Sequence, residues 1–222
     1  MARVNGILGP LSGRVGNLVF YYSGGNSYVR SRPMKTTKAP SRAQTVQRAR
    51  FALAMGFVAP LWRAVKDGFA VPRHNAPSVN QVMKQVLKEA VCGRYPKLHL
   101  DFPKVKVTKG PLEGLCCPVL GDLTGADGNI LAGASPGGCS CLLLRWKWFP
   151  SRFNAAGNDL VKVVLYNENG KSFSLHEDAF RSDGKAVLSV PGSLRGDILH
   201  AYIFTESISG QRSCSQYLSV QL

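Results

Sequence analysis

Short strands separated by turn residues fill the chain from about residue 95 to its end, and they limit the folds open to it. In residues 141–148, Leu142, Leu144 and Trp146 alternate with Leu143 and Arg145, which is typical of a strand with one buried face. We predict strands over residues 98–101, 105–109, 117–121, 141–148, 160–167, 171–174, 186–190, 198–205 and 213–220. The last seven indicate an antiparallel immunoglobulin-like or fibronectin-like β-sandwich.

A β-hairpin is predicted near the N-terminus. Residues 15–32 hold two runs rich in Val, Phe and Tyr, on either side of a Ser-Gly-Gly-Asn turn at residues 23–26. Strict alternation puts Val15 and Tyr21 on the face opposite Leu18. Because both faces are partly apolar and a lone hairpin is only marginally stable in water, we expect the hairpin to need a partner surface.

A basic arm and two helices follow the hairpin. Residues 30–42 contain two prolines, five Lys or Arg residues and no apolar period, so they predict an extended arm. A capping box at Ser41 opens an amphipathic helix to about Val65, which Pro60 is expected to kink or interrupt. A second capping box opens a shorter helix that ends at Gly93.

Together these elements predict an α+β fold in two parts. Residues 1–110 form a basic module of hairpin, arm and two helices, and residues 111–222 form the antiparallel sandwich. The charge follows the same division. Residues 1–110 hold 19 Lys and Arg against 3 Asp and Glu, whereas residues 111–222 hold 9 against 10. The net charge of +15 therefore belongs to the first part, and it favours an anionic partner.

The residues that would meet such a partner lie on the hairpin, the arm and the start of the first helix. The candidates for binding a polyanion or an acidic partner are Arg14, Arg30, Arg32, Lys35, Lys38, Arg42, Arg48 and Arg50. Three aromatic residues of the hairpin are candidates for stacking on unpaired bases or for packing in a core, namely Tyr21, Tyr22 and Tyr28.

Two kinds of partner fit the basic module. Subunits that clasp their neighbours use two-faced hairpins and charged arms, and acids between Glu168 and Asp183 offer an opposite charge. A sequence-independent DNA- or RNA-binding protein would use the same basic residues on phosphates, although no base-reading motif is present. We expect the first, a non-enzymatic structural or assembly protein that forms a homo-oligomer or a larger virion or filament, and keep nucleic-acid binding as the alternative.

The sequence offers no recognisable catalytic motif. Its four histidines are scattered, and it contains no nucleophile elbow, phosphate-binding loop or zinc-protease motif. The cysteine pairs at residues 116–117 and 139–141 lack the spacing of a structural zinc knuckle, so we expect ordinary strand cysteines, with zinc as the alternative. We therefore expect no enzymatic activity, cofactor or small-molecule substrate.

Neither a signal peptide nor a membrane span is apparent. The N-terminal residues form a broken apolar run interrupted by Gly and Pro, and the longest apolar run, near residues 139–144, is too short to span a bilayer. We expect a protein made in the cytoplasm, with no membrane partner, that is incorporated into a virion or other particle.

Several motifs point to a family. They are Gly-Ile-Leu-Gly at residues 6–9, Ser-Gly-Arg-Val-Gly at residues 12–16 and Ala-Gln-x-x-Gln-Arg-Ala-Arg-Phe at residues 43–51. With these motifs the chain resembles uncharacterised proteins of Bacteroidota that carry a domain of unknown function. The N-terminal part also resembles small proteins from phage structural-gene neighbourhoods. The resemblance implies the two-part architecture and a phage or mobile-element context, and it implies no activity.

Overall fold

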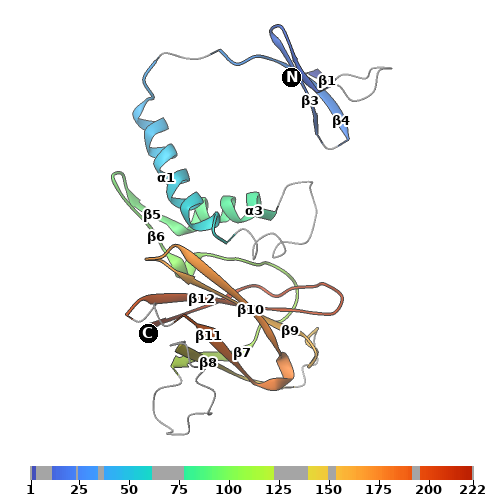
Figure 1. Ribbon diagram of the computed structural model, residues 1–222, viewed down its shortest axis with the longest axis vertical. Coiled ribbons are helices and arrows are strands. Elements are labelled where there is room, and N and C mark those ends of the chain that lie inside the picture. Colours follow the sequence, from blue (N-terminus) through green and yellow to red (C-terminus); the bar gives the residue numbers. More distant parts are fainter. Residues whose placement is uncertain are drawn as a thin grey trace. The chain divides into compact units, whose positions relative to one another are not determined.

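The computed structural model describes residues 2–3, 12–23, 25–34, 38–61, 78–122, 140–149, 154–191 and 196–221 (Figure 1). The chain divides into two compact units, Met1–Arg42 and Ala43–Leu222. Each unit is described by itself.

The first unit contains a small antiparallel sheet. Its central hairpin joins β3 (Leu18–Ser23) to β4 (Asn26–Ser31), as the sequence predicted. Gly25 has a φ of +80° in the turn, a backbone conformation that glycine adopts at little cost. Two short strands that were not predicted, β1 (Ala2–Arg3) and β2 (Gly13–Val15), extend the hairpin to the order β1-β4-β3-β2.

The second unit contains a two-sheet sandwich. One sheet has the order β11-β8-β7 and the other the order β10-β9-β12-β13. The strands that form them are β7 (Cys116–Asp122), β8 (Ser140–Lys147), β9 (Leu160–Asn167), β10 (Ser172–Phe180), β11 (Lys185–Val190), β12 (Ile198–Glu206) and β13 (Gln216–Gln221).

The core of the sandwich lies between these sheets. On β8 the side chains of Leu142, Leu144 and Trp146 are buried, as the alternating pattern predicted. They pack against side chains from the facing sheet, including Val163 on β9 and Ile203 on β12. Every second residue of these strands points into this core, because successive side chains of a strand point to opposite faces.

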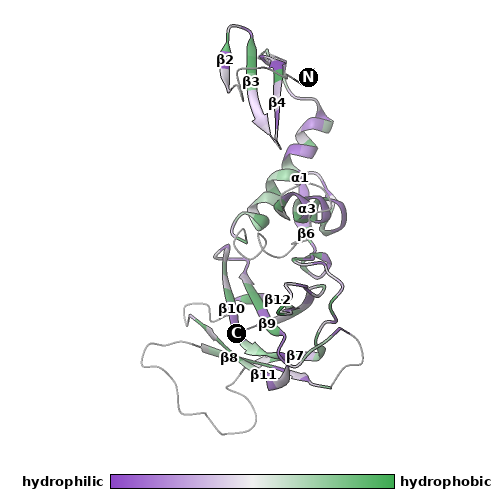
Figure 2. Cartoon of the chain, turned by 90° about the vertical axis from the view of Figure 1, so that its right-hand side faces the viewer, coloured by the Kyte–Doolittle hydropathy of each residue, from purple (hydrophilic) through white to green (hydrophobic). Residues whose placement is uncertain are grey.

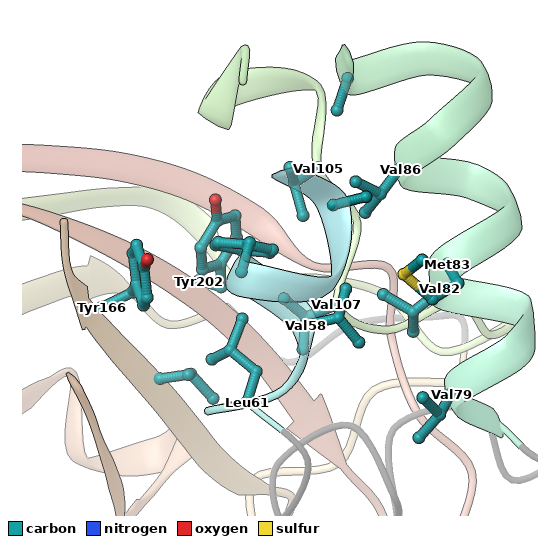
Figure 3. Close-up of a cluster of buried hydrophobic side chains, with 14 of the residues drawn as sticks. Val58, Leu61, Val79, Val82, Met83, Val86, Val105, Val107, Tyr166 and Tyr202 are labelled. Carbon is teal, nitrogen blue, oxygen red and sulfur yellow. The ribbon is translucent and has the colours of Figure 1, made fainter. Parts of the chain in front are cut away.

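A helical layer covers the other face of the four-stranded sheet. It consists of α1 (Arg42–Val58), α3 (Ser78–Gln85) and a π-helical turn, Val86–Ala90. Figure 3 shows side chains of both helices, such as Val58 and Val82, in one buried cluster with Tyr166 of β9 and Tyr202 of β12. The central strands β9 and β12 are therefore buried on both faces (Figure 2). No helix among the described residues is long and apolar enough to cross a bilayer.

The α+β class predicted from the sequence is wrong, because the described part of the chain is mostly β. It has four sheets, the fourth being the hairpin of β5 (Val91–Arg94) and β6 (Lys97–Leu100), and α1 and α3 are its two α-helices. The helices also end earlier than predicted. The residue before a proline disfavours the helical conformation, and α1 ends at Val58, just before Ala59-Pro60. The second helical segment ends at Ala90, so Gly93 lies in β5 instead of closing a helix.

The boundary between the compact units falls at Arg42 in the sequence, and side chains of α1 share a core with those of β9 and β12. The functional division near residue 110 that the charge suggested stays a prediction. Two predicted strands also need correction. Residues 105–109 do not form a strand, and the strand predicted at residues 171–174 begins at Ser172 and continues to Phe180.

Candidate partner-binding surface

Strand pairing gives the N-terminal sheet two chemically different faces. Directly opposite residues of antiparallel neighbours point to the same face. Val19 lies opposite both Arg14 on β2 and Arg30 on β4, and Tyr21 lies opposite Tyr28. These five residues form one face, which we call the Arg–Tyr face.

Aromatic and cationic groups lie close together on the Arg–Tyr face. The rings of Tyr21 and Tyr28 stack with centroids 5.5 Å apart and an interplanar angle of 22°. The guanidinium carbon of Arg30 lies 5.7 Å from the centroid of the Tyr21 ring, within the range of a cation–π contact. Arg14 is exposed, and its Nε donates to the carbonyl of Gly16 over 3.4 Å.

The opposite face of the sheet is mainly apolar, with Ser27 and Ser31 of β4 as its polar members. It carries Val15, Leu18, Phe20, Tyr22 and Val29, which the strand register places together. Val15 is 69% exposed, Tyr22 54% and Leu18 45%. The sequence-based alternation wrongly put Val15 on the face of Tyr21, because the turn at Gly16-Asn17 reverses the chain and brings Val15 opposite Leu18.

The other basic candidates of the first unit follow the sheet. The side chain of Arg32 is exposed, and its backbone N–H donates to the carbonyl of Asn17 over 2.8 Å. Lys38 and Arg42 are also exposed, whereas Lys35 lies outside the described residues. The exposed members of the set are thus available to solvent, and within the described part of the first unit no hydrogen bond or ion pair joins them to Arg14 or Arg30.

The two remaining arginines, on α1, differ from each other. Arg48 is exposed, but Arg50 is partly buried and donates from Nη2 to the carbonyl of Leu87 over 2.9 Å. Arg50 therefore links α1 to the π-helical turn. A charge count cannot distinguish such a residue from a solvent-facing one, because the acceptor is a backbone carbonyl 37 residues away.

Only some of the acidic side chains between Glu168 and Asp183, which were expected to face a basic arm, are available to an outside partner. The carboxylate of Glu177 pairs with Lys162 over 3.0 Å, and Asp183 accepts a hydrogen bond from the Phe180 N–H over 2.8 Å. Asp178 is exposed, and the Glu168 side chain is 63% exposed. Glu168 and Asp178 are therefore the acids best placed for an outside partner.

A buried polar network in the sandwich was not anticipated from the sequence. The Nε of Arg181 lies 3.1 Å from the Oδ2 of Asp159, an ion pair without a hydrogen bond from that nitrogen. The other guanidinium nitrogens donate to the carbonyls of Glu113 and Gly114 and to the hydroxyl of Thr205. These contacts attach the segment that precedes β7 to strand β12. They therefore stabilise the fold and do not form a binding site for a partner.

An aromatic cluster under the helical layer was also missed. The His200 ring stacks on Phe102 with centroids 3.8 Å apart, and its Nδ1 lies 2.8 Å from the Tyr217 hydroxyl. Burial lowers the pKa of His200 below its ordinary value, while the nearby Glu168 carboxylate acts in the opposite direction. The hydroxyl of Tyr202 donates to the Phe102 carbonyl over 3.1 Å. The cluster thus ties the segment around Phe102 to the sheet.

A shallow cleft of about 210 Å³ lies between β10 and β11. Among its lining residues are His176, whose pKa is lowered by burial, and Asp183, which already holds the backbone of Phe180. The Nε2 of His176 lies 3.2 Å from the Ser174 hydroxyl. Among the residues that the structure describes, no group of three His, Cys, Asp or Glu side chains could hold a metal ion. Cys139 of the predicted 139–141 pair lies outside them.

Comparison with known proteins assigns a family to this chain. Neither the curated proteins nor the solved structures include a match. The model of a family of unknown function, DUF6266, matches residues 10–219, which span both compact units. This match agrees with the resemblance to an uncharacterised domain family. The chain therefore belongs to the family of unknown function DUF6266.

Proposed function

We propose that this chain is a non-enzymatic structural or assembly protein whose N-terminal sheet docks on a second copy of the chain. The observation that carries the proposal is the apolar face of that sheet, with Val15, Leu18 and Tyr22 all close to half exposed or more. A contiguous apolar face of this kind is typical of a surface that is covered in an assembly.

The size of the sheet supports the same proposal. Its four strands have 2, 3, 6 and 6 residues, and no helix or second sheet lies among the described residues of Met1–Arg42 before α1 begins. A single layer of this size buries little apolar surface of its own, because a stable domain needs two packed layers. Pairing the apolar faces of two copies would supply the second layer with two-fold symmetry.

The basic arm supports association in a secondary way. Arg32, Lys38 and Arg42 are exposed, and Glu168 and Asp178 of another copy would offer them opposite charge. Exposed ion pairs add little affinity, but they steer encounters and are weakened by salt. A particle subunit also fits the phage or mobile-element context of Bacteroidota that the N-terminal motifs imply.

Size-exclusion chromatography with light scattering, at low and moderate salt, tests the proposal on the full chain. We expect a dimer or larger assembly that dissociates on dilution. The double variant Val15→Thr/Leu18→Thr removes apolar surface and places a β-branched threonine, which favours strands, at both positions, so the strands should still form. It should weaken association at least about tenfold, or about 1.4 kcal/mol.

The matched control is Val187→Thr, on an exposed position of β11 that is 52% exposed. This control should associate like the natural sequence. A natural chain that stays monomeric at high concentration would refute the proposal, as would equal association of the V15T/L18T and V187T variants.

A further inference from the structure

The Arg–Tyr face has features that the assembly proposal does not use. It lies on the side of the sheet away from Val15 and Leu18, so docking through the apolar face leaves it open to a different ligand. Its chemistry differs as well, because it combines two arginines with two half-buried tyrosine rings. Figure 2 shows β4, which contributes Arg30 and Tyr28, as a largely hydrophilic strand.

The strand register arranges this face in two rows. Arg14, Val19 and Arg30 form one row across three strands, and Tyr21 and Tyr28 form the next row on the same face. Rows on one face are two residues apart, or about 7 Å along the strand. The row that holds the two arginines therefore lies beside the aromatic pair, at a distance that one nucleotide unit can span.

Charge complementarity narrows the ligand to an anion. Residues 1–66 contain no Asp or Glu, so no carboxylate of this unit competes for Arg14 or Arg30. A highly basic surface attracts polyanions without sequence preference, because each phosphate contact releases counterions. Charge alone would suit an acidic protein as well as a nucleic acid.

The stacked tyrosines favour a nucleic acid over an acidic protein as the ligand. Aromatic side chains beside cations form the platform on which unpaired bases stack, whereas an acidic peptide offers few planar rings. Bases within a duplex are already stacked on each other and are not available to Tyr21 and Tyr28. From this arrangement we infer that the Arg–Tyr face binds single-stranded DNA or RNA without reading its sequence. The ligand's phosphates meet Arg14 and Arg30, and one base stacks on the tyrosine pair.

Fluorescence anisotropy with the full chain and a labelled 20-nucleotide oligothymidylate tests this inference, with a duplex of equal length for comparison. The variant Arg14→Gln/Arg30→Gln should weaken binding at least about tenfold. It should also reduce the slope of log K against log salt by about 1.4, since each phosphate contact on a single strand contributes about 0.7. Arg94→Gln/Lys97→Gln removes the same charge from the exposed adjoining ends of β5 and β6 and should bind normally.

The aromatic contribution is tested separately. Tyr21→Leu/Tyr28→Leu removes the aromatic rings on which a base would stack. It should therefore weaken binding of the oligothymidylate at least about fivefold. Tyr21→Phe/Tyr28→Phe retains both rings and should bind like the natural sequence, which guards against a general loss of folding. Light scattering of the R14Q/R30Q variant should show unchanged association, so failure of this inference is distinguishable from failure of the assembly proposal.

Three results would overturn the inference. One is the absence of oligothymidylate binding at low salt. Another is equal binding by the R14Q/R30Q and R94Q/K97Q variants. The third is duplex binding as tight as single-strand binding with no effect of the leucine variant, which would show a charged surface without base stacking.

Discussion

Arg181 carries a positive charge into the interior of the sandwich, where it is 4% exposed. Burying a charge is costly unless it is paired and hydrogen-bonded. Here Asp159, itself 1% exposed, supplies the opposite charge, and the backbone carbonyls of Glu113 and Gly114 accept hydrogen bonds. The Arg181 carbonyl in turn accepts a hydrogen bond from the Trp146 indole over 2.7 Å. The pair therefore orders the chain before β7 and a tryptophan of the core together.

Removing one partner of this pair should be strongly destabilising. Asp159→Asn leaves the Arg181 charge buried and unpaired, so we expect it to lower the free energy of unfolding by about 3 kcal/mol. Urea unfolding followed by tryptophan fluorescence measures the change. The control is Asp101→Asn, which breaks the pair of Asp101 with Lys104, whose side chain is 57% exposed, and should have little effect. Equal losses in the two variants would contradict a structural role for Arg181.

At the scale of elements, Arg50 attaches α1 to the π-helical turn, whereas Arg48 on the same helix is exposed. Arg50→Gln removes the bond to the Leu87 carbonyl and should lower the free energy of unfolding by about 1 kcal/mol. Arg48→Gln removes the same charge from an exposed position of the same helix and should be nearly neutral. Thermal unfolding of both variants checks the difference. If both variants unfold at the same temperature, the contact contributes nothing to stability.

The predictable elements were those marked by a regular alternation or by an unbroken run of strand-forming residues. Residues 160–167 match β9, and the alternation of Leu142, Leu144 and Trp146 identified β8 and its buried face. The strand predicted at residues 171–174 was too short, because β10 continues past a register shift between His176 and Ala179 that breaks the period of two. A pattern that depends on alternation cannot follow a strand through such an irregularity.

The candidate surface was predictable only in its composition. The sequence indicated that basic residues and tyrosines gather near the N-terminus, but it did not indicate which residues share a face. That depends on the pairing of β2 with β3, which puts Arg14 opposite Val19. The sequence also did not indicate that Arg50 donates to a backbone carbonyl. That carbonyl belongs to Leu87, and a local sequence pattern does not predict a contact between residues so far apart.

Among the described residues of Ala43–Leu222, two hydrophobic cores share one sheet. Leu165 and Ile203 face the second sheet, while Tyr166 and Tyr202, next to them along β9 and β12, face the helical layer. A break near residue 110 would therefore divide one of these cores, because Val58 and Val82 lie before the break and Tyr166 and Tyr202 lie after it. A break near Arg42 leaves both cores complete.

Two truncated chains should consequently behave in opposite ways. Residues 41–222 retain both cores and should unfold cooperatively, whereas residues 111–222 lack the helical layer and expose apolar side chains of β9 and β12, including Val164, Tyr166, Tyr202 and Phe204. We expect the shorter chain to aggregate or to bind a hydrophobic dye, because contiguous apolar surface of this kind favours association. Gel filtration, dye fluorescence and thermal unfolding compare the two. A monomeric, cooperatively folded 111–222 chain without dye binding would instead make residue 110 a true domain boundary, with the helices only an addition to an independent sandwich.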